Sequence, residues 1–187
     1  MYLNTPRSRT AKLMGTSILA ALVLVFDYAL KYSGLKIPFP WYPDLKFDFT
    51  GVPIMLSLLM YGPDSAVVTS TVAGLGILAR SGNLLSASIK SLAELSTVAG
   101  FHLGLRVVVD RTLGGRWLGA ASVIAITTRV AAMTLVNLYV LPNLYGVPLE
   151  ATYGLLPLIA VFNLAQGAIT VGLGVFPDGA VRKRLPG

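Results

Sequence analysis

Long apolar runs recur along this chain, and they limit what it can fold into more than any other feature. A run of about 20 apolar residues in an α-helix spans a bilayer core of about 30 Å. The runs cover Ala11–Leu30, Val52–Tyr61, Ser65–Ala79, Leu84–Val109, Trp117–Leu141 and Tyr153–Phe176. Gly62-Pro63 is a helix stop between the second and third, which are short, and Pro142-Asn143 ends the fifth. The pattern predicts an all-α membrane protein with six transmembrane helices in one bundle, a single domain over residues 1–187.

The composition excludes the soluble classes. Hydrophobic residues make up 55% of the chain and charged residues 12%, whereas soluble domains have about 45–50% apolar and about 25% charged residues. The chain has no cysteine and one histidine, which rules out thiolate and histidine-rich metal sites. The sequence contains neither a G-x-x-x-x-G-K-[ST] nor an H-E-x-x-H motif. We therefore expect no enzymatic activity, no metal and no cofactor.

Basic residues indicate how the bundle is oriented. Six helices place both termini on one side, and cytoplasmic segments are enriched in Lys and Arg. With the termini inside, the inner segments hold nine basic residues and the outer segments four. The inner ones are Arg7, Arg9, Lys12, Arg106, Arg111, Arg116, Arg182, Lys183 and Arg184, and the outer ones Lys31, Lys36, Lys46 and Arg80. Both termini are predicted to be cytoplasmic, and the basic tail is expected to contact anionic membrane lipid rather than nucleic acid.

The longest polar connection, residues 32–50, is predicted to lie outside. It carries three prolines, which stiffen it, and a set of aromatic residues that includes Trp41, Phe47 and Phe49. Two interpretations remain open. The aromatic residues form an interfacial belt, or the segment is a lid over an outward-facing site.

Charged residues within a membrane span need partners. Glu94 lies about ten residues from the outer end of its run and Arg129 about twelve, so their depths agree within about 3 Å. The two side chains can therefore pair. Either the pair is structural and joins two helices, or it contacts a ligand.

Three amide side chains fall in the last two runs, namely Asn137, Asn163 and Gln166. Asn163 and Gln166 are three residues apart and share a helix face. Each amide offers donors and acceptors together, which suits the edge of a heterocycle. Hydrogen bonding between helices is the equal alternative.

Small residues recur at four-residue spacing, which allows close helix packing. The pairs are Ala11 and Gly15, Ser17 and Ala21, Ser70 and Gly74, Gly100 and Gly104, and Ala168 and Gly172. Ser17 and Ala21 form a stripe along the first helix. This stripe packs either inside the bundle or against another membrane protein.

Taken in order, several motifs resemble the substrate-binding S component of energy-coupling factor (ECF) transporters, nearest the riboflavin-binding branch. The resemblance runs from about Leu13 to Phe176 and is carried by residues 45–53 (LKFDFTGVP), 61–63 (YGP), 93–95 (AEL), 136–142 (VNLYVLP) and 162–167 (FNLAQG). It implies a six-helix multi-pass protein of a prokaryotic plasma membrane. Such a protein binds a vitamin from outside and joins a transmembrane coupling subunit and two cytoplasmic ATPases.

The resemblance also implies roles for individual residues. Asn137, Asn163 and the position of Gln166 would contact the flavin, and Glu94 would lie beside the pocket. Thr97 stands where the family has an asparagine, and Gln166 stands where it has a lysine. Ser17 and Ala21 would face the coupling subunit.

We therefore expect a vitamin-binding membrane subunit that captures riboflavin or a related flavin for ATP-driven uptake, with a site formed by the residues above, Phe49 and Arg129. Two alternatives remain. One is an S component for another small heterocyclic vitamin, and the other a structural subunit of a membrane complex.

Overall fold

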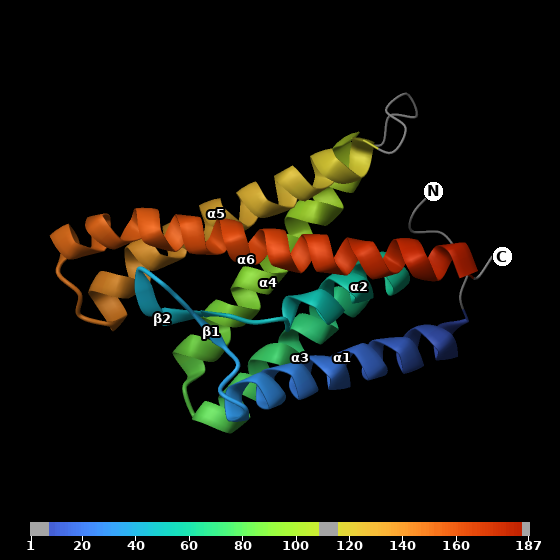
Figure 1. Cartoon of the computed structure of the whole chain (residues 1–187), viewed down its shortest axis with the longest axis horizontal. Coiled ribbons are helices and arrows are strands. Elements are labelled where there is room, and N and C mark those ends of the chain that lie inside the picture. Colours follow the sequence, from blue (N-terminus) through green and yellow to red (C-terminus); the bar gives the residue numbers. More distant parts are fainter. Residues whose placement is uncertain (1–7, 109–115, 185–187) are drawn as a thin grey trace.

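A computed structural model describes residues 8–108 and 116–184, and in this part of the chain six helices form one bundle (Figure 1). The predicted all-α bundle is confirmed. Its elements are α1 (Arg9–Tyr32), β1 (Ile37–Phe39), β2 (Tyr42–Phe47), α2 (Gly51–Tyr61), α3 (Pro63–Ser81), α4 (Leu84–Val108), α5 (Arg116–Leu144) and α6 (Leu149–Arg184). Arg7, Val109 and Arg111, which entered the predictions above, lie outside the described residues.

The helices contact one another in a closed ring, in the order α1, α3, α4, α5, α6, α2 and back to α1. The short helix α2 also contacts α3 and α4, and it supplies Ile54, Met55 and Leu58 to the buried core. The start of α1 and the end of α6 lie at the same end of the bundle (Figure 1). This agrees with an even number of passes.

Three of the six helices are long and apolar enough to cross a membrane by themselves. They are α1, residues Leu118–Leu144 of α5 and residues Leu149–Phe176 of α6. Helix α2 is apolar but short. Helix α4 is long enough, but Lys90 and Glu94 lie within it. The more polar helices α3 and α4 therefore depend on packing against their neighbours within the bundle.

The turn between α2 and α3 shows why the two short runs are separate helices. Gly62 has φ 95°, a conformation that a residue with a Cβ adopts only under strain. Its N–H donates to the Leu58 carbonyl and closes α2. Pro63 then occupies the first turn of α3, where a missing N–H costs nothing.

Two helices extend beyond their predicted ends. The predicted stop at Leu141 is wrong, because α5 continues through Pro142 to Leu144. Pro142 lacks the N–H that would bond the Leu138 carbonyl, yet the helix continues past it for two residues. Beyond Pro142 the last carbonyls are satisfied again, because the Tyr145 N–H donates to the Val140 carbonyl and the Val147 N–H donates to the Leu141 carbonyl. Helix α6 begins at Leu149 and ends at Arg184, because a helix can continue through polar residues outside the apolar run.

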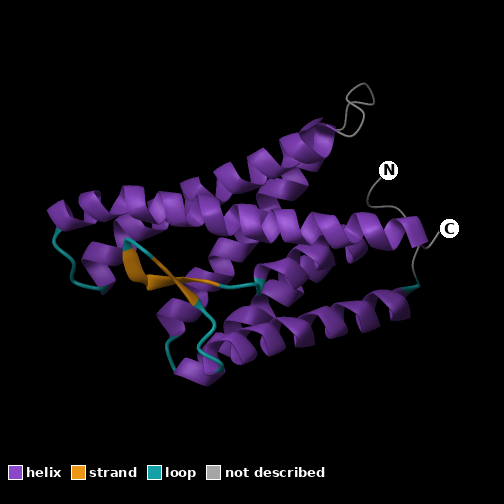
Figure 2. Cartoon of the chain, in the orientation of Figure 1, coloured by secondary structure: helices purple, strands orange, loops and turns teal. Residues whose placement is uncertain are grey.

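The outer connection contains an antiparallel hairpin formed by β1 and β2, which the sequence analysis did not predict (Figure 2). Its prolines argue against a central strand. They are tolerated here because the sheet has only two strands, and each strand has a free edge. The register pairs Ile37 with Phe47 and Phe39 with Tyr42.

The small-residue pairs have different environments. A Cβ on Gly104 would lie 2.7 Å from the Ala121 Cα, and one on Gly100 would lie 2.9 Å from the Ala125 Cα. This pair therefore brings the α4 and α5 backbones together inside the bundle. In contrast, Ser17 and Ala21 are exposed along α1.

Candidate ligand-binding site

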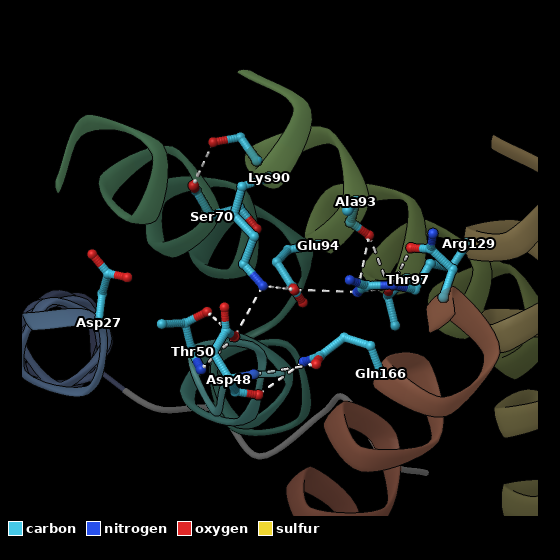
Figure 3. A network of polar contacts seen from close by, with 12 residues as sticks. Asp27, Asp48, Thr50, Ser70, Lys90, Ala93, Glu94, Thr97, Arg129 and Gln166 are labelled. Atoms are coloured by element: carbon cyan, nitrogen blue, oxygen red, sulfur yellow. Dashed lines mark hydrogen bonds and ion pairs between the residues drawn. The ribbon is translucent and has the colours of Figure 1, made fainter. Parts of the chain in front are cut away.

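A chain of alternating charges runs through the buried centre of the bundle (Figure 3). Glu94 and Arg129 are 0% and 1% exposed, and Arg129 Nη1 lies 3.2 Å from Glu94 Oε1. The expected pairing is confirmed. Lys90 Nζ also lies 2.8 Å from Glu94 Oε1 and 3.0 Å from Asp48 Oδ1. Two carboxylates and two cations thus neutralise one another, as buried charges require.

Arg129 connects this row of charged residues to two other predicted site residues. Its Nε donates to Asn163 Oδ1 at 3.2 Å, and its Nη1 donates to Thr97 Oγ1 at 3.0 Å. Asn163 in turn donates to the Ile159 carbonyl of its own helix. The guanidinium therefore links α4, α5 and α6 at one depth. The planar fork of donors makes arginine suited to this position.

Gln166 contacts the main chain of Asp48 with both ends of its carboxamide. Gln166 Nε2 donates to the Asp48 carbonyl at 2.8 Å, and the Asp48 N–H donates to Gln166 Oε1 at 3.3 Å. The same side chain thus satisfies a donor and an acceptor at the point where β2 ends. This contact fixes the end of the hairpin to α6.

The Asp48 side chain begins the next element. Its Oδ1 accepts hydrogen bonds from the Thr50 N–H and the Thr50 hydroxyl, and Thr50 directly precedes α2. Burial alone raises the pKa of the Asp48 carboxyl, but the Lys90 ammonium and the Thr50 hydroxyl outweigh it, and the pKa lies below its usual value. Asp48 is therefore ionised and holds Lys90 in place.

Two buried oxygen atoms beside these charged residues have no hydrogen-bond partner in the described part of the protein. They are Glu94 Oε2 and Thr170 Oγ1. Both lie against Gly51, where an added Cβ would come 2.6 Å from the first and 2.3 Å from the second. A side chain at this position would force the Thr170 hydroxyl and the Glu94 carboxylate to shift.

An aromatic cluster adjoins the charged residues. Phe39 and Phe47 of the hairpin lie 5.7 and 5.0 Å from Phe162 of α6, measured between ring centroids. Phe47 precedes Asp48 and Phe162 precedes Asn163 in the sequence, so the apolar and polar groups are neighbours. Trp41 packs edge-on against Phe39 at 5.1 Å. The hairpin therefore covers one side of the site with aromatic rings.

Two predicted site residues lie apart from these contacts. The Asn137 side chain is half-buried and donates to the Met133 carbonyl of its own helix at 2.8 Å. Phe49 is 38% exposed. Of the predicted set, the structure brings together Glu94, Thr97, Arg129, Asn163 and Gln166.

Sequence reasoning missed Asp48 and Lys90. Lys90 is one helical turn before Glu94, and an i, i+4 pair of opposite charges is a recognisable signal. Asp48 belongs to the motif at residues 45–53, but its position over the bundle depends on how the hairpin folds back.

A second ionic cluster lies where the hairpin begins. The Asp27 carboxylate of α1 is 2% exposed, and it lies 2.6 Å from Lys36 Nζ and 2.9 Å from Arg80 Nε. Lys36 directly precedes β1, and Arg80 is in the last turn of α3. Asp27 therefore fastens the start of the hairpin, as Gln166 fastens its end.

Comparison with known proteins identifies the fold. No family model matches the sequence, and no curated protein matches it. Among solved structures, the S component of a bacterial ECF transporter superposes with a TM-score of 0.78, over 96% of this chain and 100% of that chain, at 21% sequence identity. The chain has an S-component fold. The fold that the resemblance implied is thus confirmed.

Proposed function

We propose that this chain is the substrate-binding S component of an ECF-type transporter, and that it captures riboflavin or a related flavin from outside the cell. The observation that carries the proposal is an S-component fold built around a buried cluster of hydrogen-bonding groups. Polar side chains within a membrane bundle are expensive, and they mark ligand pathways more often than they serve packing alone.

The chemistry of the cluster supports binding rather than catalysis. Each of its ionised groups lies within ion-pair distance of an opposite charge. Paired charges of this kind orient neighbouring groups and hold them still. In this proposal the chain binds the vitamin without a cofactor, and the energy for transport comes from ATP hydrolysed by its partners.

The neighbouring aromatic cluster supports a planar ligand. Phe47 and Phe162 lie beside Asp48 and Asn163, so a flat ring that stacks on the phenyl groups has amide and main-chain groups at its edge. In this proposal Glu94, Thr97, Arg129, Asn163 and Gln166 form the polar edge of the pocket, Arg129 partly by positioning Asn163. Phe49 and Asn137 complete the pocket when the ligand is bound. The hairpin is the lid.

Helix α1 is proposed as the surface that meets the transmembrane coupling subunit. Ser17 and Ala21 are exposed on it, and the same stripe continues through Leu24, Val25 and Tyr28 into an open apolar groove between α1 and α3. Small exposed residues allow a partner helix to approach closely. Two cytoplasmic ATPases complete the transporter, in the plasma membrane of a prokaryote with both termini inside.

A second candidate keeps the fold and changes the ligand. Gln166 replaces the lysine of the riboflavin branch, and its side chain is uncharged. The missing charge favours a ligand other than riboflavin, namely another small heterocyclic vitamin. A structural subunit without a ligand is less favoured, because such a subunit has no need for a polar cluster beneath a hairpin.

The proposal is tested by the colour and fluorescence of the purified protein. A flavin S component is expected to carry bound flavin, or to quench the fluorescence of added riboflavin with a saturable titration. Co-purification of a coupling subunit and two ATPases tests the assembly. A colourless protein that quenches no added flavin but binds another heterocycle selects the second candidate, and one that binds no vitamin at all contradicts both.

A further inference from the structure

Gln166 contacts both main-chain polar groups of Asp48. The N–H and the C=O of this one residue face the same side-chain carboxamide. In an antiparallel ladder, two main chains form a reciprocal pair of this kind. Here a single group with an acceptor and a donor on one edge satisfies both.

That edge has a defined chemistry. In a primary carboxamide the oxygen and one N–H lie on the same side of the C–N bond. A trans peptide group cannot present both on one side. The amide of a lactam or imide ring is held cis, and it presents the same pair at the same spacing. The Asp48 main chain is thus complementary to a cyclic amide as well as to glutamine.

The surroundings of Asp48 suit a ring that carries such an edge. Phe47 precedes it, and the Phe162 ring lies 5.0 Å from the Phe47 ring. The neighbouring charges balance in pairs, so an uncharged amide replaces Gln166 without leaving a buried charge unpaired. Gln166 makes no other hydrogen bond within the described residues, so its displacement by a ligand breaks these two contacts alone.

We propose that the Asp48 main chain is the edge that recognises the ligand, that it takes the cis-amide group of a lactam- or imide-containing heterocycle, and that Gln166 occupies this edge in the empty protein. The inference rests on the proposed function, because it requires that a ligand reaches the site. It narrows the ligand to rings with adjacent N–H and C=O groups, and excludes rings that lack the N–H.

The test removes the carboxamide and returns a small cyclic amide in its place. Gln166→Ala leaves a cavity beside Asp48. The probes are 2-pyrrolidone, which has the cis N–H and C=O pair, and N-methyl-2-pyrrolidone, which keeps the carbonyl but lacks the N–H. The measurement is hydrogen exchange of the Asp48 amide, together with the melting temperature in detergent.

We expect the Asp48 amide to exchange about tenfold faster in Gln166→Ala than in the wild type. Millimolar 2-pyrrolidone should restore most of the protection, and N-methyl-2-pyrrolidone should not. If the alanine variant does not fold, the same measurements are made on Gln166→Ser, which leaves a similar cavity. Equal effects of the two probes, or unchanged exchange in the variant without a probe, would overturn the proposal.

Riboflavin and 3-methylriboflavin, measured on the wild type, separate this inference from the proposed function. If riboflavin binds and its 3-methyl derivative binds about tenfold or more weakly, both hold. Equal binding of the two flavins leaves the transporter proposal in place and overturns the recognition edge. If neither flavin binds, the flavin assignment fails, and the pyrrolidone pair still decides whether Asp48 recognises a cyclic amide.

Discussion

The Arg129 guanidinium lies 3.2 Å from the Glu94 carboxylate, although the two residues come from different helices and both are almost wholly buried. Glu94 also binds Lys90. The carboxylate therefore binds two cations, whereas Arg129 has one anionic partner among the described residues. The effects of removing Glu94 and Arg129 are expected to differ.

Glu94→Gln should destabilise the protein more than Arg129→Met. The first change removes the negative charge from between two cations, and the second leaves Glu94 still paired with Lys90. Breaking a buried pair costs about 3–5 kcal/mol, and removing both partners costs less than the sum. Thermal unfolding of the two single variants and the double variant in detergent measures this. Strictly additive losses would show that the pair is not coupled.

Gly51→Ala should disrupt the site directly. The new methyl group would lie 2.3 Å from Thr170 Oγ1 and 2.6 Å from Glu94 Oε2, and overpacking of this kind costs about 1–3 kcal/mol. Gly172→Ala is the matched control, since nothing lies within 4 Å of its added Cβ. Adding Thr170→Ala to Gly51→Ala should recover part of the loss. A fully stable Gly51→Ala protein would mean that the packing at Gly51 is looser than described.

Asn163→Ala should weaken ligand binding by about 1–3 kcal/mol, because it leaves a buried polar group of the ligand without a partner. Titration with riboflavin in detergent, followed by fluorescence quenching, measures the change in Kd. Asn143→Ala is the control, because Asn143 is exposed and bonds only the Tyr139 carbonyl in the described structure. Equal affinity in Asn163→Ala and the wild type would remove Asn163 from the site.

Ala21→Trp should separate binding from transport. Ala21 is exposed on α1, so a large side chain there leaves the bundle intact while it prevents close approach of a partner helix. We expect unchanged melting temperature and flavin affinity, with loss of uptake and of coupling-subunit capture. Ala131→Trp, at an exposed position of α5, controls for bulk at the lipid surface. Normal capture and uptake in Ala21→Trp would contradict docking on this face.

Asp27→Asn should loosen the start of the hairpin. Lys36 and Arg80 both lose their anionic partner, and their side chains are only 14% and 12% exposed. Hydrogen exchange over residues 35–47 should quicken, while exchange in α5 stays the same. Asp64→Asn is the matched control, because Asp64 pairs with Lys12 at the surface and such pairs contribute about 0–1 kcal/mol. If both variants behave alike, Asp27 does not fasten the hairpin.

The sequence predicts the bundle well, because span length and Gly-Pro stops are local properties. The break between α2 and α3 depends only on the backbone conformation of Gly62, which the sequence specifies locally. The end of α5 is less predictable. Whether a helix passes Pro142 depends on the residues that follow it, and here the N–H groups of Tyr145 and Val147 satisfy the last carbonyls.

The site is predictable only in part. Depth along two helices is enough to pair Glu94 with Arg129. The i, i+4 spacing of Lys90 and Glu94 is also a local signal. The position of Asp48 requires the hairpin to return over α4 and α6, and no local pattern in a proline-rich segment specifies that path. The contact of Gln166 with a main-chain edge is likewise a product of the closed fold.

The placement of Lys90 and Glu94 on α4 also constrains how the chain enters the bilayer during synthesis. A lone charged residue at the centre of an inserting helix costs about 2.5–3.5 kcal/mol, and α4 is not among the helices that qualify as independent spans. Its charges are neutralised by Arg129, which is made later, and by Asp48, which is made earlier. Lys90 and Glu94 pair with each other within α4, but the set of ion pairs around them is complete only after α5 has been made.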